Sequence, residues 1–250
     1  MRFASLLPLA LFMLTSLVVS IRLVVLWRQT RKLPELLLAT ALFSTGFLAY
    51  AVGTASKLLT TASVDTRRSL TMIMMTIECI GIVALIAFAL RVFHRGKKWP
   101  AAFAALLCAF VAAAVCAEVL SGEFLRYTDS ERISGLYVPL GLAARGSGPA
   151  WMAFECFRYY AKLRRQLAIG LVPRLVVDRV LAWGIGIGAS TLAYAFTVGH
   201  RLTYGTGIQE HDWAVGTVSL LALISSLCIA FAFFPPQRYR RWASKEAHDA

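Results

Sequence analysis

The chain has 250 residues, of which 58% are hydrophobic and only 16% are charged, and its formal net charge is +13. A soluble domain usually has about 25% charged residues and slightly under half apolar ones. The apolar residues fall into seven long blocks, and the short segments between these blocks hold most of the Lys, Arg, Asp and Glu. This pattern excludes an ordinary soluble domain and predicts an all-α membrane protein.

The blocks are long enough to cross a bilayer, whose apolar core of about 30 Å requires roughly 20 residues of helix. The predicted spans are residues 5–27, 34–56, 69–92, 100–121, 148–165, 176–199 and 213–235. The first block is too long and too uniformly apolar for a cleaved signal peptide, so we interpret it as the first span. We expect one transmembrane domain over residues 1–250, with an outer segment at 122–147 and a basic tail at 236–250.

The fifth block, residues 148–165, is the weakest of the seven. Gly148 and Pro149 stand at its start, and Glu155 and Arg158 interrupt its apolar sequence. A six-helix alternative would omit this block. We favour seven helices, with the fifth block as a span that carries polar groups.

Positive charge is concentrated in alternate loops, and this alternation predicts an orientation. Basic residues follow spans 1, 3 and 5 and occupy the tail: Arg28, Arg31, Lys32, Arg91, Arg95, Lys97, Lys98, Arg158, Lys162, Arg164, Arg165, Arg174, Arg179, Arg238, Arg240, Arg241 and Lys245. Loops rich in Lys and Arg stay in the cytoplasm, so the N-terminus is predicted outside and the C-terminus inside the inner (plasma) membrane. The basic loops would form a rim at the cytoplasmic surface, so the predicted partners are the bilayer and its anionic lipids. The positive net charge therefore does not indicate a nucleic-acid partner.

Two parts of the sequence are similar to each other. The end of span 3 matches the end of span 7: Ile86-Ala87-Phe88-Ala89 precedes Trp99, and Ile229-Ala230-Phe231-Ala232 precedes Trp242. Spans 2 and 6 also match, because each has a Ser/Thr pair followed by a tyrosine: Ser44-Thr45 before Tyr50, and Ser190-Thr191 before Tyr194. We interpret spans 1–3 and 5–7 as parallel copies of one unit, with span 4 as a linker helix that gives both copies the same orientation. Parallel repeats of this kind occur in transporters.

This organisation resembles the broad 3+1+3 seven-helix group that includes the SWEET and PQ-loop transporters, the KDEL receptor and the microbial rhodopsins. The stretch from Arg31 to Leu38 also resembles segments of uncharacterised bacterial seven-helix proteins. Span 7 lacks the lysine to which a rhodopsin attaches retinal, and the Pro-Gln pair of the PQ-loop proteins is absent. The resemblance therefore implies a topology, but neither a light-driven pump nor a particular substrate.

A carboxyl group in the middle of a span requires an explanation, because a charged side chain at the bilayer centre costs about 2.5–3.5 kcal/mol. Glu78 lies near the middle of span 3, with no basic residue within two turns of its own helix. The cost falls if the carboxyl is protonated. Glu78 is therefore either a proton-coupling or ligand-binding group in a cavity, or a neutral acid hydrogen-bonded to a neighbouring helix.

Other charged residues inside the spans have structural explanations. Glu155 and Arg158 are three positions apart and can pair on one helix face, although Glu155 is also a candidate ligand group. Arg22 can extend towards the inner surface. Glu118 lies close to the outer end of span 4, where we expect it to reach the interface.

Aromatic and hydroxyl residues provide the remaining candidates for a ligand site. Tyr50 and Tyr194 occupy matching places in the two copies and would face each other across a central axis, together with Thr45, Ser190, Trp183 and Trp151. Such a set would suit a polar or amphipathic small molecule. The alternative is that the tyrosines belong to an interfacial belt and the tryptophans to the packed core.

The histidines do not predict a metal or a cofactor. No two of them fall on facing spans at one depth, as a bis-histidine haem requires. His200, His211 and Asp212 lie near one another at the outer side, with Glu123 or Asp129 as further candidates, but their spacing matches no zinc motif. We interpret them as surface polar residues.

Two functions remain open from the sequence. A small-molecule transporter agrees with the parallel repeat and with Glu78; a receptor or sensor that signals through a separate cytoplasmic partner agrees with the long outer segment. An intramembrane enzyme is disfavoured, because we find no catalytic spacing. The sequence does not decide whether the chain forms a homo-oligomer.

Overall fold

The computed structural model describes residues 3–58, 63–122 and 136–245. All regular structure in these residues is helical, which confirms the all-α class. The elements are α1 (Phe3–Thr30), α2 (Leu33–Ala41), the π-helix η1 (Leu42–Leu48), α3 (Ala49–Leu58), α4 (Val64–Phe93), α5 (Lys98–Ser121), α7 (Tyr137–Leu167), α8 (Arg174–Tyr204), the 3₁₀-helix η2 (Ile208–Glu210), α9 (Asp212–Phe233) and α10 (Gln237–Lys245).

Six helices are long and apolar enough to cross a membrane, judged by length and composition over the described residues. They are Leu7–Thr30, Leu33–Ser56, Val64–Phe93, Lys98–Ser121, Arg174–Tyr204 and Asp212–Phe233. Each coincides with one of the predicted spans, and the second combines α2, η1 and the start of α3. These helices are compatible with a multi-pass integral membrane protein.

The fifth predicted span lies in α7, which is not among these six helices. It is nevertheless 31 residues long and packs against α4, α5 and α8. Its polar residues lower its mean hydropathy, but Arg145 and Glu155 are buried and point into the bundle rather than towards lipid.

Helix α7 also begins much earlier than residue 148, the predicted start. Residues 137–147, predicted as part of an outer loop, are helical, while 123–135 lie outside the described residues. The glycines that marked a helix start in the sequence instead permit close packing. A Cβ atom on Gly148 would lie 2.8 Å from the Ile82 side chain of α4.

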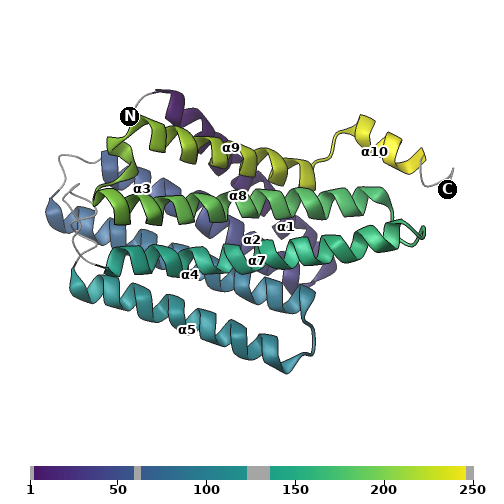
Figure 1. The fold of residues 1–250 in the computed structure, drawn as a ribbon, viewed down its shortest axis with the longest axis horizontal. Coiled ribbons are helices and arrows are strands. Elements are labelled where there is room, and N and C mark those ends of the chain that lie inside the picture. Colours follow the sequence, from purple (N-terminus) through teal and green to yellow (C-terminus); the bar gives the residue numbers. More distant parts are fainter. Residues whose placement is uncertain (1–2, 59–62, 123–135, 246–250) are drawn as a thin grey trace.

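The helices form an antiparallel bundle in which chain neighbours pack together (Figure 1). Helix α1 packs against α2 and α9, α4 packs against α2 and α7, and α8 packs against α7 and α9. Helix α5 packs against α4 and α7 from the outside of the bundle (Figure 1). The contacts therefore close a ring through α1, α2, α4, α7, α8 and α9.

The π-helix η1 is held tightly between α1 and α4. A Cβ atom on Gly46 would lie 2.5 Å from the Ser16 Cβ atom of α1, and one on Gly81 of α4 would lie 2.5 Å from Thr45 Cγ2. Both glycines therefore allow the backbones to approach closely, as small residues do in membrane helices. A π-helical turn often accompanies a functional site, and Gly81 is one turn from Glu78.

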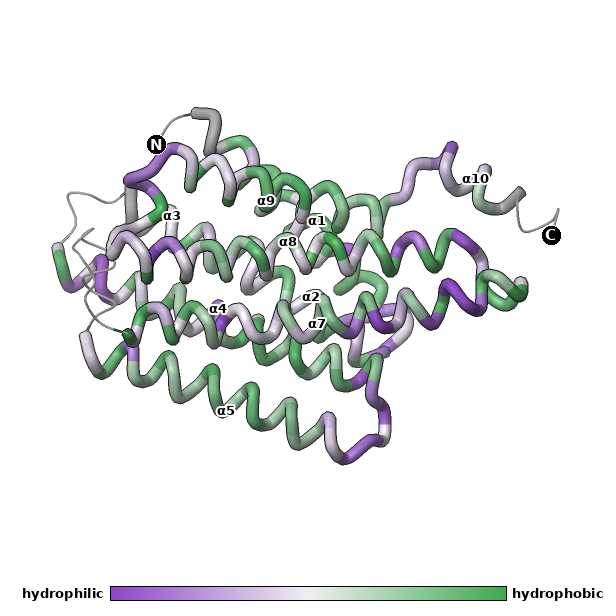
Figure 2. The backbone as a smooth tube through the Cα atoms, in the orientation of Figure 1, coloured by the Kyte–Doolittle hydropathy of each residue, from purple (hydrophilic) through white to green (hydrophobic). Residues whose placement is uncertain are grey.

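We call the end of the bundle that carries the α7–α8 turn the basic end. Helices α7 and α8 extend beyond α4 and α9 at this end, and hydrophilic residues dominate the extensions (Figures 1 and 2). Two arginines secure the end of α9 there: Arg22 Nη1 donates to the Phe233 carbonyl at 2.8 Å and Arg179 Nε to the Ala232 carbonyl at 2.6 Å. These bonds satisfy carbonyls that a helix end leaves unpaired.

Candidate functional site

Charged and hydroxyl groups from four helices meet inside the bundle, and we call this set the Arg145 network. It consists of Glu78 of α4, Glu118 of α5, Arg145 of α7 and Tyr194 of α8. Arg145 Nε lies 3.5 Å from Glu78 Oε2, and Arg145 Nη1 lies 3.2 Å from Glu118 Oε2. The Tyr194 hydroxyl donates a hydrogen bond to Glu78 Oε1. One guanidinium therefore joins two carboxyl groups that belong to different helices.

The network is almost completely removed from the surface. Glu118 is 2% exposed and Arg145 is 4% exposed, and the Glu78 side chain retains 13%. Burying such charges is costly unless they are paired, and removing one partner typically costs about 3–5 kcal/mol. With both carboxyl groups ionised these four side chains hold two negative charges and one positive charge, and the Arg201 guanidinium of α8 also acts electrostatically on Glu118.

The backbone leaves room for this arrangement at Gly141, one turn before Arg145 on α7. A Cβ atom there would overlap Glu118 Oε2 and lie 3.0 Å from Glu118 Cδ. Gly146 has a similar role towards α8, because its Cβ atom would lie 3.2 Å from Tyr194 Cβ. Glycine at both positions therefore allows the Glu118 and Tyr194 side chains to approach α7.

The sequence singled out Glu78 and Tyr194, and the structure brings these two residues together. It corrects the prediction for Glu118, which does not reach the interface but is buried against Arg145. Arg145 itself was missed because it fell in the predicted outer segment. The available signal was the apolar stretch around it, which continues the periodicity of the following helix back to Val138.

The other predicted ligand residues lie at varying distances from the network. Thr45 contacts the Gly81 position of α4 and donates to the Ala41 carbonyl at 2.8 Å. Tyr50 is 41% exposed and packs edge-on against Phe12. Ser190 is 2.9 Å from the Ser225 hydroxyl of α9, so its hydroxyl joins α8 to α9. The Thr45 and Ser190 hydroxyls therefore have partners outside the network, whereas Tyr50 interacts electrostatically with Tyr194 of the network.

A second buried charged cluster lies towards the basic end, and we call it the Glu155 cluster. His94 Nε2 lies 2.8 Å from Glu155 Oε1, and Arg158 Nε lies 3.1 Å from Glu155 Oε2. The pairing of Glu155 with Arg158 is the one that their spacing predicted. His94 and Glu155 are 1% and 2% exposed, whereas the Arg158 side chain is 51% exposed and reaches the surface.

The two predicted tryptophans belong to this half of the bundle and not to the Arg145 network. Trp151 stacks on the His94 ring with the planes 13° apart and the centroids 6.0 Å apart. Trp183 packs edge-on against Phe233. Both are buried, so the core-packing interpretation describes their environment.

Histidines also meet at the opposite end of the bundle. His200 Nε2 lies 3.2 Å from His211 Nδ1, and the His200 ring packs against Tyr204 and Trp213. His200 is buried, which corrects its interpretation as a surface residue. Among the described residues no group of three or more His, Cys, Asp or Glu side chains could hold a metal ion.

Comparison with family models, with curated proteins and with solved structures finds no match for this chain. Its function must therefore be argued from the site. The Arg145 network offers a buried acid–base group where four helices join, and the Glu155 cluster offers a second one nearer the basic end. Intramembrane acids and histidines of this kind mark ion and proton pathways.

Proposed function

We propose that the protein is a seven-helix transporter of the inner (plasma) membrane that exchanges a proton for a small amine-bearing solute at the Arg145 network. The observation that supports the proposal is the buried Arg145 guanidinium, which two carboxyl groups from different helices share. A proton on Glu78 and a cationic solute beside it would each neutralise the Glu78 carboxylate. They would therefore compete, and competition between two ligands for one site is the basis of exchange.

The packing supports two parts of the proposal: that α7 is a span, which brings the number of spans to seven, and that the bundle consists of two parallel repeats. Helices α1, α2 and α4 pack in sequence, and so do α7, α8 and α9. The contact of α1 with α9 then corresponds to that of α7 with α4, because each joins the first helix of one unit to the last helix of the other. Helix α5 stands outside this ring, as a linker between two units would. The basic loops support a cytoplasmic basic end.

The geometry suggests how protonation would alter the network. Ionised Glu78 accepts a hydrogen bond from Tyr194 and attracts Arg145, and so links α4 to α7 and α8. A proton on Glu78 removes the attraction to Arg145 and leaves that guanidinium to Glu118 alone. Contacts between α4 and α7 would weaken while those between α5 and α7 persist. The network thus offers a local change in packing that depends on one proton.

Proton movement in proteoliposomes tests the proposal. The purified chain would be reconstituted with a pH-sensitive dye inside, and gradients of methylammonium, ethanolamine, glycine and lysine would be applied. We expect at least one amine to drive proton movement, and Glu78→Gln to abolish this response. Glu35→Gln, the same change near the basic end, is the matched control and should retain it. Amine-independent dye signals in a folded protein, or normal coupling in Glu78→Gln, would contradict the proposal.

A receptor or sensor is the second candidate, and the extended α7–α8 hairpin favours it. This hairpin provides a surface at the basic end that a separate protein could bind. Binding of an external ligand could change the conformation of this surface and so transmit a signal. Flux of a solute into sealed vesicles distinguishes the two functions, because a sensor would bind its ligand without net transport.

A further inference from the structure

We propose that the tip of the α7–α8 hairpin is a docking surface for an acidic protein in the aqueous phase at the basic end. We define the hairpin tip as residues 158–178. The inference does not rest on transport, and it supplies the partner that the sensor alternative requires. Length, charge and exposed apolar groups carry the argument.

The hairpin is too long to end in the lipid. Helices α7 and α8 have 31 residues each, or about 46 Å at 1.5 Å per residue, whereas α9 has 22 residues, or about 33 Å. Helix α4 ends beside Glu155, because its C-cap His94 pairs with that residue. Helix α7 then continues to Leu167, up to about 18 Å farther. With the apolar core ending at the level of His94, a headgroup layer of about 5–8 Å would leave the tip in water.

The tip carries a dense positive charge. Its exposed basic side chains are Arg158, Lys162, Arg164, Arg165 and Arg174. The two acidic residues nearby pair with two of these basic groups, Glu155 with Arg158 and Asp178 with Arg174. The positive charge of Lys162, Arg164 and Arg165 remains. An acidic surface would complement this charge and accelerate association.

The turn between the helices exposes two apolar side chains at the hairpin tip. Ile169 and Leu171 are each 69% exposed, on either side of Gly170, whose φ of +71° closes the turn. Exposed apolar residues rimmed by charge are typical of protein–protein contacts. The hairpin tip therefore presents an apolar contact inside a basic rim.

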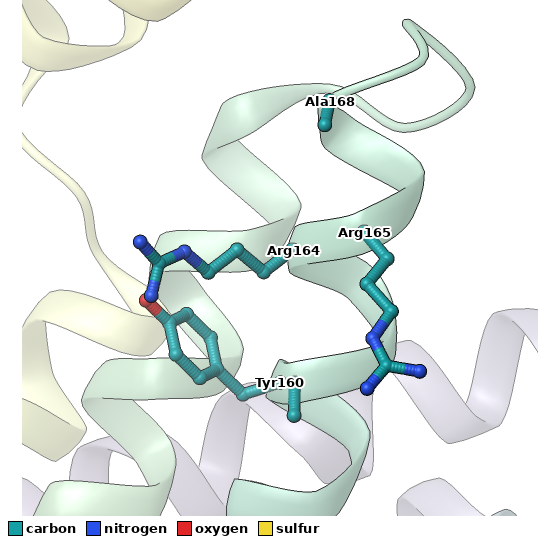
Figure 3. A pocket seen from close by; sticks show the side chains of 5 residues that line it. Tyr160, Arg164, Arg165 and Ala168 are labelled. Carbon is teal, nitrogen blue, oxygen red and sulfur yellow. The ribbon is translucent and has the colours of Figure 1, made fainter.

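A shallow pocket extends this surface along α7. It is lined by Tyr160, Ala161, Arg164, Arg165 and Ala168 and has a volume of about 410 Å³. The Tyr160 ring and the Arg164 side chain extend together on one side, and Arg165 points to the other (Figure 3). Either guanidinium could pair with a carboxylate side chain of an acidic partner, because arginine and carboxylate groups form bidentate pairs.

Helix α10 holds the base of the hairpin in place. The Tyr239 hydroxyl donates to Asp178, and the Arg174 guanidinium lies 4.5 Å from the centre of the Trp242 ring. These contacts link α10 to the first turns of α8. A surface that is ordered before binding loses less entropy when its partner docks.

Site-specific photocrosslinking of the full chain in its native membranes tests the inference. A photoreactive residue replaces Leu171 at the tip, or Leu220 on α9 as a control. We expect a protein adduct from position 171 but not from 220, with the linked peptide of the partner rich in Asp and Glu. The double reversal Arg164→Glu with Arg165→Glu should lower the adduct yield at least about tenfold. The matched reversal Arg95→Glu with Lys97→Glu, outside the hairpin, should not.

A second measurement distinguishes a lipid from a protein. A fluorophore at position 171, in a chain without its native cysteines, would be placed in nanodiscs that contain nitroxide-labelled anionic lipid. We expect weak quenching compared with a fluorophore at Leu33, at the start of α2. Strong quenching at 171, adducts with lipid alone, or a yield that is insensitive to the charge reversals would overturn the inference.

Discussion

Adding one methyl group at Gly141 tests whether the Arg145 network holds α5 against α7. The Cβ atom of an alanine there would overlap the Glu118 carboxylate and lie 3.0 Å from its Cδ atom. Glu118 is 2% exposed and ion-paired to Arg145 at 3.2 Å, so a shift of its carboxylate away from position 141 would disturb that contact. Gly141→Ala should therefore weaken the network although it adds only one apolar carbon.

The size of the effect follows from two opposed contributions. Weakening the charged contact between Arg145 and Glu118 should cost about 1.5–3 kcal/mol, the range for an interaction that involves a charged group. Replacing glycine by alanine inside a helix stabilises it by about 0.5–1 kcal/mol. We expect the free energy of unfolding to fall by about 1–2 kcal/mol. At Gly216 of α9 a Cβ atom meets nothing within 4 Å. Gly216→Ala should therefore raise the free energy of unfolding by about 0.5–1 kcal/mol, without weakening any ionic contact.

The assay is reversible unfolding of the purified chain in mixed micelles with increasing SDS, followed by far-ultraviolet circular dichroism. A double-mutant cycle isolates the contact, because an alanine at position 141 has no carboxylate to displace once Glu118→Ala is present. The coupling between the two substitutions should be about 1.5–3 kcal/mol. Equal stability of Gly141→Ala and Gly216→Ala, or a coupling near zero, would refute the steric reasoning.

Two further predictions concern charge. Arg145→Gln leaves two buried carboxyl groups without their cation and should lower the free energy of unfolding in the same assay by about 3–5 kcal/mol, with partial recovery when Glu118→Gln is added. A loss below about 1 kcal/mol would mean that the buried pairs contribute little. For the orientation, a fluorescent protein fused after Ala250 should fluoresce and an alkaline phosphatase fused there should be inactive, because basic loops remain in the cytoplasm. The reverse pattern would invert the topology.

Some of the candidate site was accessible from the sequence. Glu78 could be recognised because an acidic residue inside an apolar block is conspicuous whatever surrounds it, and Tyr194 because it matched Tyr50 in the second copy. Arg145 could not, because glycines next to it indicated a loop. Those glycines in fact permit close helix packing. The sequence of one segment does not show whether its glycines belong to a loop or to a packed helix.

The buried ionic contacts depended on residues far apart in the chain. Glu78 and Tyr194 are separated by 116 positions, and Glu118 approaches Arg145 only where Gly141 leaves space for it. His94 looked like a residue at a helix end, yet it is buried because α7 passes beside it with Glu155 and Trp151. The partner of a buried charge is determined by helix packing, so a single segment cannot identify it.

The sequence by itself predicted a helical chain with seven spans, and six of these coincide with helices that are long and apolar enough to cross a membrane. Helix length and hydropathy are local properties, and the bilayer thickness sets the length that a span needs. The tertiary structure showed that α7, which is not among the six candidate spans, is a helix packed against α4, α5 and α8 with Arg145 and Glu155 buried. It also decided that Glu118 pairs inside the bundle rather than at the interface. The physical reason is that a charge within a membrane protein is tolerated through its partners, and those partners come from other helices.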